Sequence, residues 1–170
     1  MENKLTEILQ TLQKMIGFHR QLLDLMRSER DVLIQADIQA IQTVTQNKQS
    51  ILENIRRLEI DRQKLIAELA SIWKKPARDL SLANIIHLIQ GENLKLADQL
   101  RSASTALTVL IQRISEQNQS NATLVEQSLH HISEMKKNVL GEAVPHTDVY
   151  NPQGQKSGGM PGARLISKEA

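Results

Sequence analysis

The sequence predicts an all-α protein, an elongated antiparallel up-and-down helical bundle or coiled-coil hairpin of three to four helices that ends in a disordered C-terminal tail. Aromatic residues make up only 2% of the 170 residues, and cores with so few of them are generally built from Leu and Ile on long helices. Apolar residues recur at steps of three and four as far as Leu140, as packed helices require. Most Gly and Pro residues follow Leu140. We therefore expect a helical bundle domain over residues 1–143 and a flexible tail over residues 144–170.

The first helix is predicted over residues 3–34. Its apolar stripe consists of Leu5, Ile8, Leu12, Met15, His19, Leu22 and Met26, widened by Leu9, Ile16 and Leu23. No second His and no carboxylate stands at ligand spacing from His19. We therefore expect a hydrogen-bonded core histidine at this position rather than a metal ligand.

The second helix is predicted over residues 38–73, with Asp37 placed to cap its free backbone amides. Its predicted inward face consists of Ile41, Val44, Ile51, Leu52, Ile55, Leu58, Leu65, Leu69 and Ile72. The connection between the first two helices is very short. They should therefore form an antiparallel hairpin.

A break is predicted over residues 74–81. Pro76 lacks a backbone donor and disfavours helix at the residue before it, while Asp79 and Ser81 are both candidates to cap the next helix. The apolar stripe that follows continues in phase past Gly91. It therefore forms either two helices with a turn near that glycine, or one helix whose C-terminal end overhangs its partners.

Polar amides interrupt the stripe of the last helical stretch. The apolar members of this stripe are Leu107, Leu110, Ile114, Leu124, Ile132, Met135 and Val139. The inward turns between Ile114 and Leu124 are occupied by Gln117, Asn118 and Asn121. An amide buried there without a hydrogen-bond partner would cost about 1–3 kcal/mol. Two interpretations stay open: the amides pair with one another across the bundle and set its register, or the face is partly open and receives another molecule.

Charge and motif patterns exclude several classes of function. The net charge is +2 and no dense basic patch is present, which argues against nucleic acid as a partner. The chain has no Cys, and no Glu is followed three residues later by His, as carboxylate-bridged metal sites in bundles require. His130 and His131 are neighbours that point about 100° apart on a helix, so they do not share one metal. We expect no enzymatic activity, no cofactor and no small-molecule substrate.

The pattern of apolar residues also bears on localisation. Residues 1–10 enter an amphipathic helical pattern directly, without the basic and apolar regions of a signal peptide. No apolar run approaches the ~20 residues that a membrane span needs. The expected localisation is the cytoplasm.

Three segments in the second half of the chain resemble a known family, namely NQSNATLVEQ, VYNPQGQKSGG and the closing RLISKEA. They are similar to the C-terminal half of the FlgN family of flagellar type III export chaperones. The resemblance is carried most specifically by Asn118, Asn121, Leu124, Glu126, Tyr150 and Gly154. The N-terminal half agrees more loosely, through SERDVLIQADIQAI and NKQSILENIRRLEIDRQKL. This chain has Asn151 where the family usually has Gly, and Asn tolerates positive φ well enough to keep a turn there.

The resemblance implies a cytosolic flagellar export chaperone. Such a chaperone binds the C-terminal helical segments of the hook-filament junction proteins (FlgK-like and FlgL-like), prevents their premature assembly and delivers them to the type III export gate. The implied client-binding residues are Gln117, Asn118, Asn121, Leu124, Leu129, Ile132 and Met135. The implied docking residue for the cytoplasmic domain of the export gate protein FlhA is Tyr150, the only Tyr of the chain. An alternative from a different class is a structural coiled-coil protein that self-associates and has no client.

Overall fold

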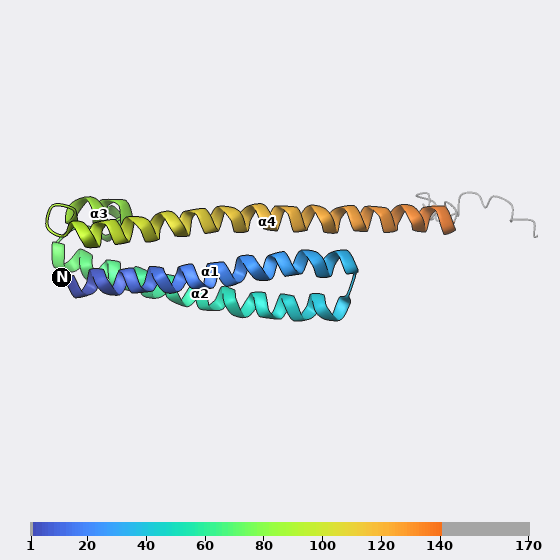
Figure 1. Ribbon diagram of the computed structural model, residues 1–170, viewed down its shortest axis with the longest axis horizontal. Helices are drawn as coiled ribbons and strands as arrows, with labels where there is room; N and C mark the ends of the chain where they lie inside the picture. Colours follow the sequence, from blue (N-terminus) through green and yellow to red (C-terminus); the bar gives the residue numbers. More distant parts are fainter. Residues whose placement is uncertain (1, 141–170) are drawn as a thin grey trace, which may run out of the picture. The chain divides into compact units, whose positions relative to one another are not determined.

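The structure, a computed structural model, describes residues 2–140, with side chains as far as Asn138. In this part of the chain there are α-helices, one short 3₁₀ helix and no strand, which confirms the predicted all-α helical bundle (Figure 1). The helices are α1 (Glu2–Gln35), α2 (Ile38–Trp73), η1 (Ala77–Asp79), α3 (Leu82–Ile89) and α4 (Leu94–Leu140). The chain divides into two compact units, Met1–Gln127 and a second unit that begins at Ser128. The predicted domain boundary at residue 143 lies outside the described residues.

The connection between α1 and α2 is a tight turn with a cap. Ala36 has a φ of 54°, in the left-handed region that commonly ends a helix. The Asp37 carboxylate then accepts a hydrogen bond from the backbone N–H of Ala40 at 3.0 Å. This is the predicted cap. It satisfies one of the free amides at the start of α2 and reverses the direction of the chain.

Two ion pairs between the helices show the antiparallel register of α1 and α2. Lys4 Nζ lies 2.8 Å from a carboxylate oxygen of Glu68, and Lys48 Nζ lies 2.7 Å from Glu29. Lys4 near the start of α1 thus pairs with Glu68 near the end of α2, and Lys48 in the first part of α2 pairs with Glu29 near the end of α1. The pKa of Lys4 is raised above its ordinary value, chiefly by its hydrogen bond to Glu68 and to a smaller extent by its hydrogen bond to Glu7. The predicted hairpin is confirmed.

The buried face of α1 is the widest in the first unit. Its buried residues are Leu5, Ile8, Leu9, Leu12, Met15, His19, Leu22, Leu23 and Met26. The predicted stripe is confirmed, with Ile16 half-buried. Nδ1 of His19 lies 2.7 Å from the carbonyl oxygen of Met15. Because a carbonyl oxygen only accepts, Nδ1 carries the proton and donates, so His19 is the expected hydrogen-bonded core residue.

The buried face of α2 is narrower than the sequence predicts. Its buried residues are Val44, Ile66, Leu69 and Ala70, and most other members of the predicted stripe are half-buried. The prediction was wrong for Leu52, which is 48% exposed, and for Ile72, which is 50% exposed. Neighbours on a helix point about 100° apart. Where only a narrow side of α2 is covered, one of two neighbours therefore stays exposed: Ile51 is half-buried while Leu52 is exposed, and Ile72 is exposed beside the half-buried Trp73.

The chain between α2 and α3 follows the predicted break. Lys74 ends α2 with a φ of 52°, and Pro76 precedes the short η1 helix. Of the two candidate caps it is Ser81 that starts α3, because its hydroxyl accepts from the N–H of Asn84 at 3.2 Å. Asp79 lies in η1 instead, and its backbone carbonyl accepts a hydrogen bond from the side-chain amide nitrogen of Asn84 at 2.8 Å.

A turn at Gly91 separates α3 from α4, so of the two alternatives the turn is confirmed. The backbone N–H groups of Glu92 and Asn93 both bond to the carbonyl of Ile89. The side chain of Asn93 then caps α4, because its oxygen accepts from the N–H of Leu96 at 3.0 Å. Its amide nitrogen donates to Glu2 at 2.9 Å, which places the start of α4 beside the start of α1.

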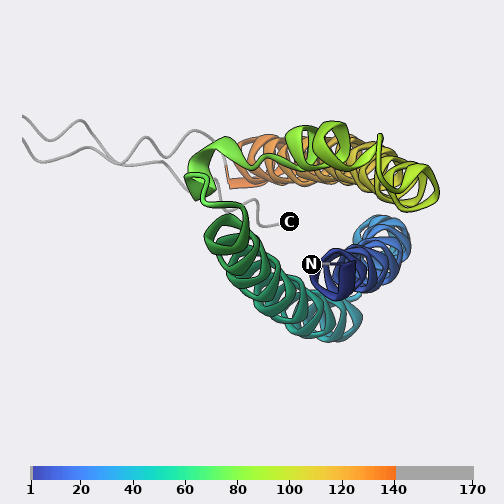
Figure 2. The ribbon, with the colours of Figure 1, turned by 90° about the vertical axis from the view of Figure 1, so that its left-hand side faces the viewer.

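One apolar cluster holds the first unit together. It combines residues of α1, the end of α2, Leu80, α3 and the beginning of α4. Its largest fully buried side chains are Ile8, Leu12, Leu69, Ile85 and Leu100. Figure 2 looks along the helices and shows α1 lying beside both α2 and α4. Fully burying one such side chain contributes about 1.5–3 kcal/mol, so this cluster is the main source of stability within the unit.

Candidate functional site

The helix α4 changes from buried to exposed along its length. In the first part of α4 the buried side chains are Leu96, Ala97, Leu100, Ala103 and Leu110, and Leu107 is half-buried. Farther on, Ile114 and Leu124 are half-buried. From Val125 to Asn138 every side chain is exposed. Between these two regions lies Asn121, a polar residue that is only 4% exposed. The predicted site residues extend from one region into the other.

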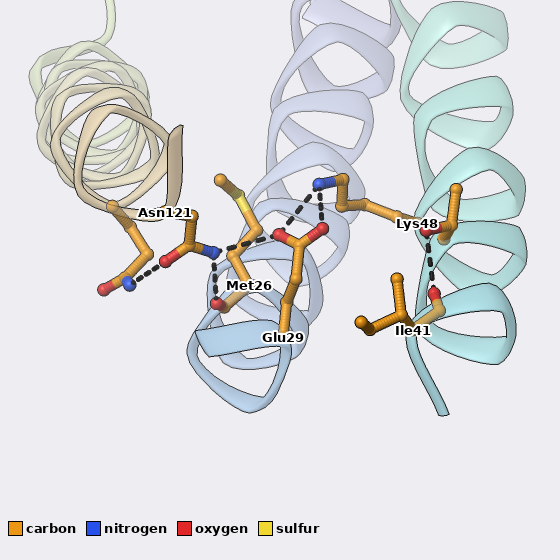
Figure 3. A network of polar contacts seen from close by, with 7 residues as sticks. Met26, Glu29, Ile41, Lys48 and Asn121 are labelled. Carbon is orange, nitrogen blue, oxygen red and sulfur yellow. Dashed lines mark hydrogen bonds and ion pairs between the residues drawn. The ribbon is translucent and has the colours of Figure 1, made fainter. Parts of the chain in front are cut away.

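Asn121 is the centre of a polar layer, which we define as Gln117 and Asn121 of α4, Glu29 of α1 and Lys48 of α2 (Figure 3). The amide nitrogen of Asn121 donates to the carbonyl oxygen of Met26 and to Oε2 of Glu29, both at 2.9 Å. Lys48 Nζ donates to the two carboxylate oxygens of the same Glu29 at 2.7 and 2.9 Å. The layer therefore connects three helices of the first unit.

The remaining contacts of this layer leave little hydrogen-bonding capacity unused. Gln117 donates its side-chain N–H to the oxygen of Asn121 at 2.9 Å, so the Asn121 amide makes three hydrogen bonds. Between the residues next to Glu29 and Asn121, the Arg30 guanidinium donates to the hydroxyl of Ser120 at 2.6 Å. Among the described side chains no buried polar atom lacks a partner. For Gln117 and Asn121 the structure thus favours the interpretation that the amides set the register of the bundle.

Asn118 does not belong to this layer. The sequence placed it on the inward turns with Gln117 and Asn121, but its side chain is exposed. That prediction was wrong because Asn118 is rotated about 60° from Asn121 around the helix axis, three residues at 100° each. Only one edge of the predicted polar segment faces α1.

Sequence reasoning missed the acidic and basic partners of the amides, although the sequence contains a signal for them. Glu29 follows His19, Leu22 and Met26 at the same steps of three and four that define the stripe of α1. Lys48 likewise follows Val44 by four residues on the stripe of α2. A charged residue at a stripe position on two helices, and amides at stripe positions on a third, indicate a polar layer between them.

The C-terminal face of α4, defined here as Leu129, Ile132 and Met135, lies in the second unit. These side chains are 62%, 61% and 53% exposed. They follow one another at steps of three, so they occupy one side of the helix. The sequence predicted Ile132 and Met135 on a packed stripe. Within the described residues these two side chains are exposed instead, so here the structure favours the second interpretation, an open face.

Open grooves also lie beside α1 in the first unit. One has a volume of about 600 Å³ and is lined by Gln13 and Ile16 of α1 and by small residues of α4 such as Ser102, Ala103 and Ala106. Another, of about 590 Å³, lies between α1 and α2. Among the described residues no three His, Asp or Glu side chains come together in a way that could hold a metal ion. None of the described helices has an apolar stretch that could cross a membrane.

Fold and site together define a helical bundle that presents an apolar helix face. A family model, FlgN protein, matches residues 1–158, and the chain therefore belongs to the FlgN family, as the resemblance predicted. Membership makes the protein a flagellar export chaperone in general terms, and this family is not known for enzymatic activity. No curated protein and no solved structure matches the chain closely enough to add a relative. Tyr150, the predicted docking residue, lies outside the described residues.

Proposed function

We propose that this protein binds the C-terminal helical segments of hook-filament junction proteins on the C-terminal face of α4. The observation that carries the proposal is the exposure of Leu129, Ile132 and Met135 in a chain that belongs to an export chaperone family. An amphipathic client helix laid on this face would pack its apolar stripe against these side chains, through anchors three and four residues apart. Met135 adds a flexible side chain that adapts to different clients.

The other predicted client-binding residues have different parts in this proposal. Gln117 and Asn121 hold α4 to α1, so they support the client site by fixing the helix that carries it. Asn118 is exposed and offers its amide to a client directly, while the half-buried Leu124 offers the outer part of its side chain. A contact of ordinary size would bury roughly 800 Å² on each partner. Binding there would cover the client segments in the cytoplasm and prevent their premature assembly.

A charge placed on the C-terminal face tests this function. Ile132→Asp should leave the bundle folded, because this side chain is 61% exposed, and should weaken binding of junction-protein C-terminal segments by more than about 2 kcal/mol through lost burial and a desolvated carboxylate. The matched control is Val109→Asp, which changes another exposed apolar residue of α4, 42% exposed. Calorimetric titration with a junction-protein C-terminal segment measures the affinity of each variant. Equal binding by Ile132→Asp and the unchanged chain would place the client elsewhere.

We further propose that the tail presents Tyr150 to the cytoplasmic domain of FlhA while α4 holds the client, so that the complex is delivered to the type III export gate. Tyrosine is a typical interface anchor, with a large contact area and few rotatable bonds, and the composition of residues 144–170 predicts no core that would require one. Tyr150→Ala should leave client binding unchanged and weaken capture of the chaperone–client complex by the isolated FlhA domain. Tyr150→Phe, which keeps the ring, is the control. Equal affinities of all three proteins for that domain would remove Tyr150 from the docking site.

The same exposed face also suits the alternative function, a structural coiled coil that closes on a copy of itself. In that case a second copy of the chain packs on Leu129, Ile132 and Met135. Light scattering after gel filtration separates the two functions. A dimer that persists on dilution and that Ile132→Asp dissociates would favour the structural protein, whereas a helical monomer that gains mass only with a client favours the chaperone.

A further inference from the structure

The methionines of this chain differ sharply in exposure. Met135, on the C-terminal face of α4, is 53% exposed, whereas Met15 and Met26 of α1 are 5% and 3% exposed. Met15 belongs to the apolar cluster of the first unit, and Met26 lies on the same buried face of α1. The other two methionines of the sequence, Met1 and Met160, lie outside the described residues. Of the three methionines that the structure describes, Met135 is therefore the one whose side chain meets solvent.

Exposure matters because the thioether sulfur of methionine is the atom that a peroxide oxidises. One oxygen atom of hydrogen peroxide is transferred to Sδ, so the thioether is oxidised to a sulfoxide and the peroxide is reduced to water. The oxidant must reach a lone pair of the sulfur to react. Packed side chains hinder this approach at Met15 and Met26, whereas the side chains of α4 that surround Met135 are themselves exposed.

A sulfoxide would change the chemistry of the C-terminal face. Met135 is the last member of the row formed with Leu129 and Ile132, and the three side chains are all apolar. Oxidation places a strongly polar S=O group in this row, and a client helix that covers the face must remove the water bound to it. The core of the first unit does not contain Met135, so its packing is not affected.

We propose that Met135 is an oxidation site, through which a peroxide lowers the affinity of the chain for its client while the bundle stays folded. This inference rests on the proposed function and deepens it, because it assigns a regulation to the same face. The burial of Met15 and Met26 protects the fold from the chemistry that changes the binding face.

Peptide mapping tests the site itself. The full-length chain is treated with dilute hydrogen peroxide for increasing times and digested, and mass spectrometry follows the gain of one oxygen atom at each methionine. Met135 should be oxidised at least about tenfold faster than Met15 and Met26, because those two side chains are packed. Circular dichroism should show unchanged helical content as long as Met15 and Met26 are not oxidised. Equal rates at the three positions would overturn the proposed site.

Titration with the purified C-terminal segment of a hook-filament junction protein tests the effect on binding. The peroxide is removed before the segment is added, so that only the chaperone is oxidised. Oxidation of the unchanged chain should weaken binding by about five- to twentyfold. The matched control is Met135→Leu, compared with itself before treatment: the same peroxide should change its affinity by less than about twofold, although the other methionines are still present. A methionine sulfoxide reductase should restore binding by the oxidised chain.

The outcomes separate this inference from the proposed function. Rapid oxidation of Met135 without a loss of affinity would overturn the inference and leave the proposed function intact. An equal loss of affinity by Met135→Leu after treatment would assign the effect to another methionine and would also overturn the inference. If the untreated chain does not bind the segment, the proposed function fails and the proposed regulation fails with it. A bound segment that slows the oxidation of Met135 would support both.

Discussion

At the scale of single residues, two asparagines three positions apart have opposite surroundings. Asn121 is 4% exposed and makes three hydrogen bonds, two of them to α1, whereas Asn118 is exposed. The acceptors around Asn121 also determine how its amide is oriented, because the Met26 carbonyl and the Glu29 carboxylate both require the nitrogen. A polar layer of this kind favours one register of the helices over others, since any shift along the axis would leave the amide unpaired.

This contrast leads to a prediction for two identical substitutions. Asn121→Ala should lower the free energy of unfolding by about 1–3 kcal/mol, because it removes the hydrogen bonds between α4 and α1 and leaves a gap in a buried position. Asn118→Ala should change it by less than about 0.5 kcal/mol, as expected for an exposed helix position. Urea denaturation followed by circular dichroism measures both. Similar effects of the two substitutions would mean that the polar layer does not stabilise the bundle.

At the scale of elements, the turn between α1 and α2 contains a conformation that its residue does not favour. Ala36 has a φ of 54°, where the Cβ atom crowds the backbone and which Gly adopts at the lowest cost. Ala36→Gly should therefore stabilise the hairpin by about 0.5–1 kcal/mol, after allowance for the greater freedom of Gly in the unfolded chain.

The matched control for Ala36→Gly is Ala67→Gly on the exposed side of α2. The same change of residue in a helix interior should destabilise the protein by about 1 kcal/mol. Thermal unfolding of the two variants should thus move the melting temperature in opposite directions. A lower melting temperature for Ala36→Gly would show that the turn conformation is not a source of strain.

At the scale of the whole molecule, stability and binding are expected from different parts of the chain. The apolar cluster of the first unit joins α1, α2, α3 and the beginning of α4, while Leu129, Ile132 and Met135 of the second unit are exposed. The face proposed to bind the client therefore does not contribute to this core. The proposed flexible tail, residues 144–170, is rich in Gly and Pro and lacks an apolar stripe.

Removal of residues 144–170 should therefore change the free energy of unfolding by less than about 1 kcal/mol, because a segment of this composition has few buried contacts to lose. Chemical denaturation of the truncated and full-length chains provides the comparison. The truncated chain should still bind junction-protein segments. A marked loss of helical circular dichroism on truncation would show that the tail packs on the bundle and would contradict the proposed division into domains.

Local patterns were sufficient to predict α1, α2 and two of the helix caps, and they left open whether the stretch after Ser81 forms one helix or two. The steps of three and four residues predicted α1 and α2 to within a residue or two, Asp37 and Ser81 cap the helices for which they were candidates, and the family followed from short segments around Asn121 and Tyr150. Each of these features depends on residues that are close together in the sequence. Helix formation, capping and the identity of an apolar face are such local properties.

Burial and pairing were decided by the tertiary structure. The stripe of α4 reads much the same before and after Asn121, yet Leu110 is 8% exposed and Ile132 is 61% exposed. Likewise, Glu29 and Lys48 lie far from Asn121 in sequence and contact it or each other only because three helices meet at that level. Periodicity shows that a face is apolar but not what covers it. Coverage depends on which distant residues pack there, and only the three-dimensional arrangement of the helices determines that.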